Sequence, residues 1–400
     1  MPQRVFITGI GIISSIGLGP DAVYDALVNK HAGIGKLTLF DTEYCDVPVG
    51  QVRLTNEELM TLAVPGKKGL YSRTSLLAII AAKQAVAMAG NEGIADSSTG
   101  LISATTTGGM DRSEVFYKDF LADNQKGRLR NVAGHDCGDG TEKIADVLGI
   151  GGPITTINTA CSSSANAIML GSRMIRQGKL KKAVAGGSDA LTLFTLNGFN
   201  SLMILDRELC RPFDETRNGL NLGEGSGFVV LESEDQLMKT GKKCLAEVTG
   251  YGNACDAFHQ TASSPEGYGA WLSMKTALAS AGLAPADIGY ITAHGTGTRN
   301  NDLSEGIAVQ KIFQDGVPDI SSTKTYTGHT LGASGAIEAV ISIISMNRQY
   351  VFPNLRFTQQ MNELAFAPVT ELKAGVKMNH IMSNSFGFGG NNTTLIFSRC

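Results

Sequence analysis

An internal repeat constrains the fold of this 400-residue chain more than any other feature of its sequence. Three segments of the first half recur, in the same order, in the second half. The pairs are Val5 to Gly11 with Ala246 to Gly252, Leu101 to Gly108 with Tyr290 to Gly297, and Ile154 to Thr159 with Ile320 to Thr325. Recurrence of this kind is typical of a duplicated structural unit. We therefore expect two related halves, residues 1–240 and 245–400.

Strand patterns alternate with helix patterns along the first half. Arg4 to Ile13 is a β-branched run that ends in glycines, and a helical stretch at Asp21 to Val28 follows it. Further segments continue the alternation, namely a helix at Ser75 to Ala89, a strand at Gly100 to Ala104, a strand at Pro153 to Asn158 and a helix at Ser162 to Gln177. This order predicts a duplicated α/β unit with a largely parallel, helix-covered sheet and ligand sites at the carboxyl ends of strands.

Composition excludes several classes of protein. With 42% hydrophobic and 18% charged residues the chain can bury a large core, and a net charge of -3 gives no general reason to bind nucleic acid. The longest apolar stretches, such as Leu76 to Ala82, are too short to span a membrane, so we expect a cytoplasmic protein. Seven cysteines without CxxC spacing indicate reduced thiols.

Cys161 is the first candidate site residue. It stands in the segment Asn158 to Ala165, where a predicted buried strand turns into a predicted helix. A thiol at a helix N-terminus lies near the positive end of the helix dipole and near unpaired N–H groups, and both favour the thiolate. Cys161 is therefore a candidate nucleophile, and the alternative is a packed core cysteine.

Two histidines, His294 and His329, each follow an apolar strand and are surrounded by glycine and threonine. A single histidine in such a place is more often structural, but two at turns that the repeat aligns indicate a joint chemical role. Metal binding by Cys161 and both histidines is the competing use. We disfavour it because the three are widely separated, no carboxylate shares their motifs, and structural zinc draws its ligands in close pairs.

A glycine-rich turn at Ser383 to Asn392 contains Phe386 and Phe388 and precedes a predicted strand at Thr393 to Phe397. Its glycines permit backbone N–H groups to approach a reacting atom, which is how an oxyanion site is built. A tight β-turn without such a role is the alternative.

Four motifs together resemble those of the β-ketoacyl-acyl carrier protein synthases, the condensing enzymes of fatty acid and polyketide synthesis, which have a thiolase-like fold. They are TACSSS, AHGTGT, KTYTGHTLGASGAIEA and NSFGFGGN, with GLNLGEGSGFVVLE between the first two. The likeness covers essentially the whole chain. It is strongest to the type with one cysteine and two histidines, since the other type has an asparagine motif in place of His329.

The resemblance implies a decarboxylating condensation of an acyl group held on Cys161 with malonyl-acyl carrier protein. The N–H groups of Cys161 and Phe388 would form the oxyanion hole, and Phe388 also matches a gate position. His294 and His329 would hydrogen-bond the malonyl thioester carbonyl as it becomes an enolate.

Supporting roles follow from the same resemblance. Lys324 would keep the charge balance of the site and pair with Glu338. Thr296 and Thr298 match positions that hold the phosphopantetheine arm, and Phe386 matches a second gate residue.

The chain departs from the family pattern at three places. Asn391 stands where threonine is frequent, and Arg299 stands where proline is frequent. Residues 131–146 form a polar segment where many relatives have an apolar one beside the acyl pocket. That polarity argues against the usual long saturated acyl substrate.

The implied partners are an acyl carrier protein and a second subunit, in a homodimer or in a heterodimer with a related chain. Carrier proteins are acidic, so basic residues should surround the tunnel mouth. The candidates are Lys67, Lys68, Arg128, Arg130 and Arg207. No redox cofactor and no metal is expected. The rival functions are a non-catalytic chain-length subunit, which lacks the nucleophile, and a thiolase acting on coenzyme A esters, which has a second cysteine in a CxG motif.

Overall fold

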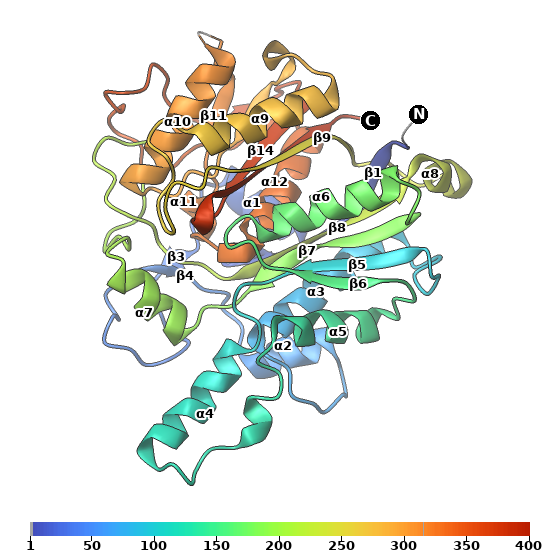
Figure 1. The fold of residues 1–400 in the computed structure, drawn as a ribbon, viewed down its shortest axis with the longest axis vertical. Coiled ribbons are helices and arrows are strands. Elements are labelled where there is room, and N and C mark those ends of the chain that lie inside the picture. The colour runs from blue at the N-terminus through green and yellow to red at the C-terminus, as the bar shows by residue number, and fades with distance from the viewer. Residues whose placement is uncertain (1–2, 315) are drawn as a thin grey trace.

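The computed structural model describes residues 3–314 and 316–400 (Figure 1). Its first half contains the strands β1 (Val5–Ser14), β2 (Gly17–Leu18), β5 (Thr99–Ala104), β6 (Ile154–Ile157), β7 (Lys182–Asp189) and β8 (Gly225–Ser233). The second half contributes β9 (Ala246–Cys255), β10 (Tyr290–Thr292), β11 (Asp319–Ser321), β14 (His380–Phe386) and β15 (Asn391–Ser398). Two small hairpin sheets join β3 (Ile34–Gly35) to β4 (Val49–Gly50) and β12 (Tyr350–Val351) to β13 (Lys373–Ala374).

The large sheet confirms the predicted duplication. Its strand order is β11-β10-β14-β15-β9-β1-β8-β7-β5-β6, with β2 paired to β1. The strands of the two halves correspond in pairs, counted outward from the centre of the sheet. The pairs are β1 with β9, β8 with β15, β7 with β14, β5 with β10, and β6 with β11. In both halves the two inner pairings are antiparallel and the two outer pairings are parallel. The three repeated sequence pairs lie on β1 and β9, on β5 and β10, and on β6 and β11. The two halves are therefore copies of one α/β unit. The prediction of a largely parallel sheet is wrong, since the sheet is mixed: in each half the strands nearest the centre pair antiparallel and only the outer ones pair parallel.

Helices cover both faces of this sheet. Those of the first half are α1 (Pro20–Val28), α2 (Asn56–Ala63), α3 (Arg73–Ala89), α4 (Met110–Ala122), α5 (Cys137–Leu148), α6 (Ser163–Arg176), α7 (Leu193–Ser201) and α8 (Glu234–Thr240). Those of the second half are α9 (Tyr268–Ala281), α10 (Arg299–Phe313), α11 (Lys324–Thr327) and α12 (Ser334–Arg348). Short 3-10 turns are η1 (Leu129–Asn131), η2 (Pro285–Asp287), η3 (Leu331–Ala333) and η4 (Phe388–Gly390).

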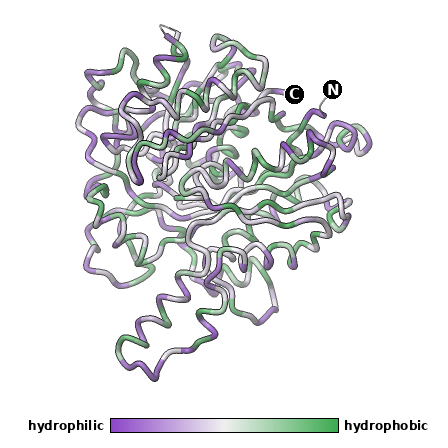
Figure 2. Tube along the Cα trace, viewed as in Figure 1, coloured by the Kyte–Doolittle hydropathy of each residue, from purple (hydrophilic) through white to green (hydrophobic). Residues whose placement is uncertain are grey.

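The two equivalent helices α6 and α12 form the central layer of the molecule (Figure 1). They pack on each other, and α12 contacts β8 of the first half as well as β14 of the second. Every residue of α12 from Ser334 to Met346 is buried, which is typical of a helix enclosed on all sides. Helices α3 and α9 pack on β1 and β9 respectively, and hydrophobic positions follow the central strands in Figure 2.

One strand differs from its sequence-based prediction. We expected the strand that precedes Cys161 to be buried, but β6 pairs only with β5 and lies at the edge of the sheet. Ile154 is 42% exposed for this reason. Helix α4 is also unusual because none of its residues is buried, and it projects from the body of the molecule (Figure 1). In the described part of the chain, no helix has the length and apolar character needed to cross a bilayer.

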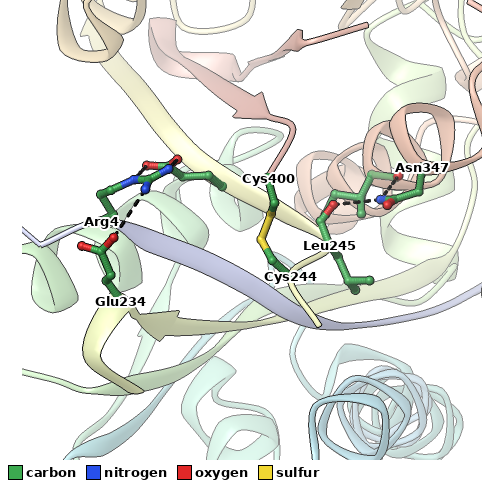
Figure 3. Close-up of a disulfide and its surroundings, with 8 residues drawn as sticks. Arg4, Glu234, Cys244, Leu245, Asn347 and Cys400 are labelled. Atoms are coloured by element: carbon green, nitrogen blue, oxygen red, sulfur yellow. Dashed lines mark hydrogen bonds and ion pairs between the residues drawn. A yellow bond between two sulfur atoms is a disulfide. The ribbon is translucent and has the colours of Figure 1, made fainter. Parts of the chain in front are cut away.

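The prediction that all cysteines are reduced thiols is wrong for two of them. Cys244 and Cys400 form a disulfide between segments 156 residues apart (Figure 3). Cys244 precedes β9 and Cys400 follows β15, and these strands pair with Ser398 opposite Glu247. The two Cα atoms lie 6.2 Å apart, within the range that a disulfide bridges. Spacing along the sequence cannot show this proximity, because it depends on the pairing of the strands.

Candidate active site

Cys161 lies in a tight turn between β6, which ends at Ile157, and α6, which begins at Ser163. Ala160 has a φ of 52°, in the left-handed region that residues other than glycine seldom adopt. The Ser163 hydroxyl group stabilises this turn, since it donates to the Ala160 carbonyl (2.5 Å) and accepts from the Thr159 N–H (2.8 Å). The Cys161 side chain is thereby held in a buried position.

The structure brings Cys161 together with both predicted histidines. The Nε2 atom of His329 lies 3.1 Å from the Cys161 Sγ atom, and its Nδ1 atom lies 3.0 Å from the Ser334 hydroxyl oxygen. The rings of His294 and His329 are nearly perpendicular, with centroids 5.3 Å apart. The cysteine comes from the first half of the chain and the histidines from the second, so the site requires both halves.

Lys324 fixes the tautomer of the His294 ring. The Lys324 Nζ atom donates to the His294 carbonyl (2.6 Å), lies 3.3 Å from the His294 Nδ1 atom, and forms a buried ion pair with Glu338. An ammonium group has donors only, so Nδ1 must be the acceptor. The proton of the neutral His294 ring is therefore on Nε2.

Burial sets the protonation of the three central side chains. It lowers the pKa of His294 and of His329 well below the usual value, and the charge of Lys324 lowers both further. Burial also raises the pKa of the Cys161 thiol to about 11, although Lys324 and the N–H groups of Phe388 and Cys161 favour the thiolate. Burial therefore opposes the thiolate that the helix N-terminus favours, and it also disfavours the charged form of both imidazoles.

Alkylation of Cys161 should follow this elevated pKa. With only a small thiolate fraction at neutral pH, its rate with iodoacetamide should rise about tenfold per pH unit from pH 7 to 9. Mass spectrometry of the Cys161 peptide would separate this reaction from that of Cys45 and Cys255, which are exposed. A rate that is already constant near pH 7 would instead indicate a preformed thiolate.

The glycine-rich turn completes the wall of the site. Phe386 ends β14 and packs its ring against His294, with centroids 5.8 Å apart. Phe388 stacks on Phe199 of α7 at 5.7 Å. Hydrogen bonding from the backbone N–H groups of Phe388 and Cys161 favours a negative charge on the Cys161 sulfur. Both N–H groups thus lie on the Cys161 sulfur side of the site, as the predicted oxyanion hole requires.

A cavity of about 440 Å³ gives access to these groups. Cys161, His294 and His329 line it together with Phe386 and Phe388. Thr296 and Thr298 also line the cavity, and their hydroxyl oxygens are 2.9 Å apart.

Two carboxylates that sequence reasoning missed fix the His294 loop. Glu305 accepts the N–H groups of His294 (2.9 Å) and Gly295 (2.8 Å), and its burial raises its pKa to about 7. Asp302 accepts the N–H group of Thr296 (3.0 Å). The signal that could have found them is their spacing of three on the helix that follows the histidine, which places both on one face.

A third missed carboxylate, Asp189, fixes the loop next to His329. It ends β7, is fully buried, and accepts the N–H group of Gly332 at 2.7 Å. It also accepts the hydroxyl group of Thr105 (2.6 Å) and the N–H group of Thr107 (3.0 Å). Nothing in the sequence distinguishes this aspartate from a solvated one.

Several other predicted positions do not reach the cavity. The proposed docking residues are exposed and none lines it; they are Lys67, Lys68, Arg128, Arg130 and Arg207. Arg207 forms an ion pair with Asp46. No residue from 131 to 146 lines the cavity either. Asn391 does not face the cavity but accepts hydrogen bonds from Ser162 (2.8 Å) and Asn166 (2.9 Å) at the start of α6.

Within residues 3–314 and 316–400, no group of three or more histidine, cysteine, aspartate or glutamate side chains is arranged to hold a metal ion. The donors that do meet, one sulfur and two imidazoles, hydrogen-bond one another or the neighbouring side chains instead.

Comparison with known proteins identifies the family. Residues 2–236 match the β-ketoacyl synthase N-terminal domain, and residues 245–358 match its C-terminal domain. The chain belongs to the β-ketoacyl synthase family. It is 33% identical to 3-oxoacyl-(acyl-carrier-protein) synthase 2 of Staphylococcus aureus, over 99% of this chain and 98% of that protein.

Solved structures agree with this assignment. The ishigamide ketosynthase/chain length factor is similar with a TM-score of 0.94 and 29% identity, and the match covers 100% of both chains. A ketosynthase in complex with its chain length factor from Xenorhabdus doucetiae is similar with a TM-score of 0.82 and 32% identity, over 100% of this chain and 98% of that one.

Proposed function

We propose that this chain is a 3-oxoacyl-acyl carrier protein synthase, which condenses an acyl group held on Cys161 with malonyl-acyl carrier protein. The observation that supports it most is the buried group of Cys161, His294 and His329 at the base of one cavity. Residues 1–240 supply the nucleophile and residues 245–400 supply the histidines.

The first half-reaction is acyl transfer. The Cys161 thiol attacks the thioester carbonyl of the acyl carrier protein as the neutral His329 Nε2, 3.1 Å away, accepts its proton. The N–H groups of Cys161 and Phe388 stabilise the oxyanion. The tetrahedral intermediate then expels the carrier-protein thiolate, which takes the proton from His329. The Ser334 hydroxyl group can donate or accept at Nδ1, so it permits both tautomers of His329.

The second half-reaction forms the carbon–carbon bond. Malonyl thioester loses CO2, and the electrons of the broken bond move into the thioester carbonyl to give an enolate. The Nε2–H groups of His294 and His329 donate to that oxygen. The enolate carbon attacks the acyl carbonyl on Cys161, the sulfur leaves as a thiolate, and one proton from solvent restores the thiol. These steps require no redox cofactor and no metal.

Other residues support this chemistry. Lys324 and Glu338 keep the His294 ring oriented. Thr296 and Thr298 hold the phosphopantetheine arm along the cavity wall. Phe386 and Phe388 gate the entry of substrate to the cavity. The enzyme acts in the cytoplasm as a dimer, either with itself or with a related subunit. The latter pairing has a precedent in the Xenorhabdus doucetiae ketosynthase, whose structure contains a chain length factor.

Intact-mass spectrometry after exposure to a panel of acyl carrier proteins tests the proposal. The expected result is one acyl group on the parent protein and none on Cys161→Ala. A parent protein that acquires no acyl group from any carrier protein, but retains its fold by circular dichroism, would contradict the proposed function and favour the non-catalytic subunit.

The proposed docking of the acidic carrier protein at Lys67 and Lys68 leads to a further prediction. Replacing Lys67 and Lys68 together by glutamate should raise KM for the acyl carrier protein and weaken its salt dependence, because two charges that attract the acidic carrier are reversed. The double variant of Lys179 and Lys181 to glutamate is the matched control, since both lysines are exposed in the segment between α6 and β7. Steady-state kinetics at several salt concentrations measure KM for the acyl carrier protein in the parent protein and in both double variants. Equal KM values for the parent and the Lys67 and Lys68 variant would exclude these lysines from docking.

A further inference from the structure

One charged side chain stands out in the wall of the catalytic cavity. Among the described residues that line it, Arg299 is the only one with a side chain charged at neutral pH, given the two neutral histidines. Arg299 is exposed, and its guanidinium group makes no ion pair or side-chain hydrogen bond with any described residue. The lining of the cavity therefore carries one positive charge, that of Arg299, without a neighbouring negative charge to compensate it.

The position of Arg299 follows from the segment that begins at His294. His294 and Thr296 are 2% and 5% exposed, Thr298 is half-buried, and Arg299 is exposed, while all four line the cavity. The segment thus runs from the reacting centre to the rim. The five steps from His294 to Arg299 span at most roughly 17 Å, which is comparable to the reach of an extended phosphopantetheine arm.

The rim around Arg299 is fixed by hydrogen bonds. Asn300 accepts the N–H group of Ser263 (2.8 Å) and donates to the Ser263 carbonyl (3.1 Å), so the loop is tied to the start of α10. The buried Arg217 donates to the Arg299 carbonyl (2.9 Å) and lies 4.0 Å from Asp302. Since Asp302 has this cation of its own, its charge does not cancel that of Arg299.

We propose that Arg299 binds the phosphate group of the phosphopantetheine arm at the mouth of the cavity. The proposal rests on the proposed function, because a carrier-protein substrate reaches Cys161 through such an arm. A guanidinium group presents a planar set of N–H donors that matches two phosphate oxygens. Anchoring the phosphate there places the thioester at the other end of the arm, beside His294.

The test compares two small extender substrates, malonyl-phosphopantetheine and malonyl-pantetheine, which differ only in the phosphate. CO2 release gives kcat/KM for each, and the ratio within one protein cancels any general effect of a substitution on the site. For Arg299→Ala this ratio should fall about tenfold from its value in the parent protein, since a charge-assisted hydrogen bond is lost. Arg299→Lys should retain part of the ratio, and added salt should lower it in the parent protein.

Lys239→Ala is the matched control, since Lys239 is an exposed, unpaired cation on α8 within the described chain, and its ratio should equal that of the parent protein. The proposal is overturned if Arg299→Ala keeps the parent ratio, or if the parent protein does not distinguish the two substrates. A parent protein that releases CO2 from neither small substrate nor malonyl-carrier protein would contradict the proposed function itself, which is a separate outcome.

Discussion

Replacing Cys161 by alanine should abolish formation of the 3-oxoacyl product while some CO2 release from malonyl-carrier protein remains. In the proposed mechanism the acyl group is attached through Cys161, whereas decarboxylation depends on the donors of His294 and His329. Product analysis by mass spectrometry and a CO2 assay on the same sample measure the two steps separately.

The control for this experiment is Cys45→Ala, which removes an exposed free cysteine and should leave both steps intact. The assignment of the nucleophile is wrong if Cys161→Ala still forms the 3-oxoacyl product. Loss of both steps together, with the fold retained, would mean that the thiol also takes part in decarboxylation.

Substituting alanine for His294 or for His329 should each slow decarboxylation by about 10²–10³, because each ring donates to an oxygen that becomes negative only as CO2 leaves. Substrate binding should change less, since the donors act mainly on the transition state. Pre-steady-state CO2 release gives the rate, and titration with a non-reactive malonyl thioester analogue gives the affinity.

His259→Ala is the control, because His259 is an exposed histidine that does not line the cavity. If either active-site variant decarboxylates at the parent rate, that histidine is structural. A variant that loses affinity as strongly as rate would show that the ring binds the ground state instead.

The sequence predicted the duplication and singled out Cys161, His294 and His329 because both depend on local patterns. Equivalent strands such as β1 and β9 have similar sequences, and Cys161 and the histidines follow strand patterns directly. Their meeting does not follow from neighbouring strands, because β6 and β10 lie toward opposite ends of the sheet. It results from the packing of α6, which follows Cys161, on α12, which follows His329.

The features that the sequence did not predict depend on three-dimensional surroundings. The raised pKa of the Cys161 thiol results from its full burial, which the sequence around it does not reveal. The edge position of β6 depends on strand order, and the Cys244–Cys400 disulfide depends on the pairing of β9 with β15. Asp189 is recognisable only when its hydrogen bonds are seen.

The division of the active site between the two halves has a consequence for synthesis of the chain. A ribosome makes the half that contains Cys161 first, and a domain can begin to fold before the rest of the protein emerges. At that stage neither His329 nor the η4 turn, to which we assign roles in acyl transfer, has been made. Under the proposed mechanism, a nascent chain presents Cys161 without its proton acceptor, and acyl transfer to Cys161 should begin only after the second half has packed against the first.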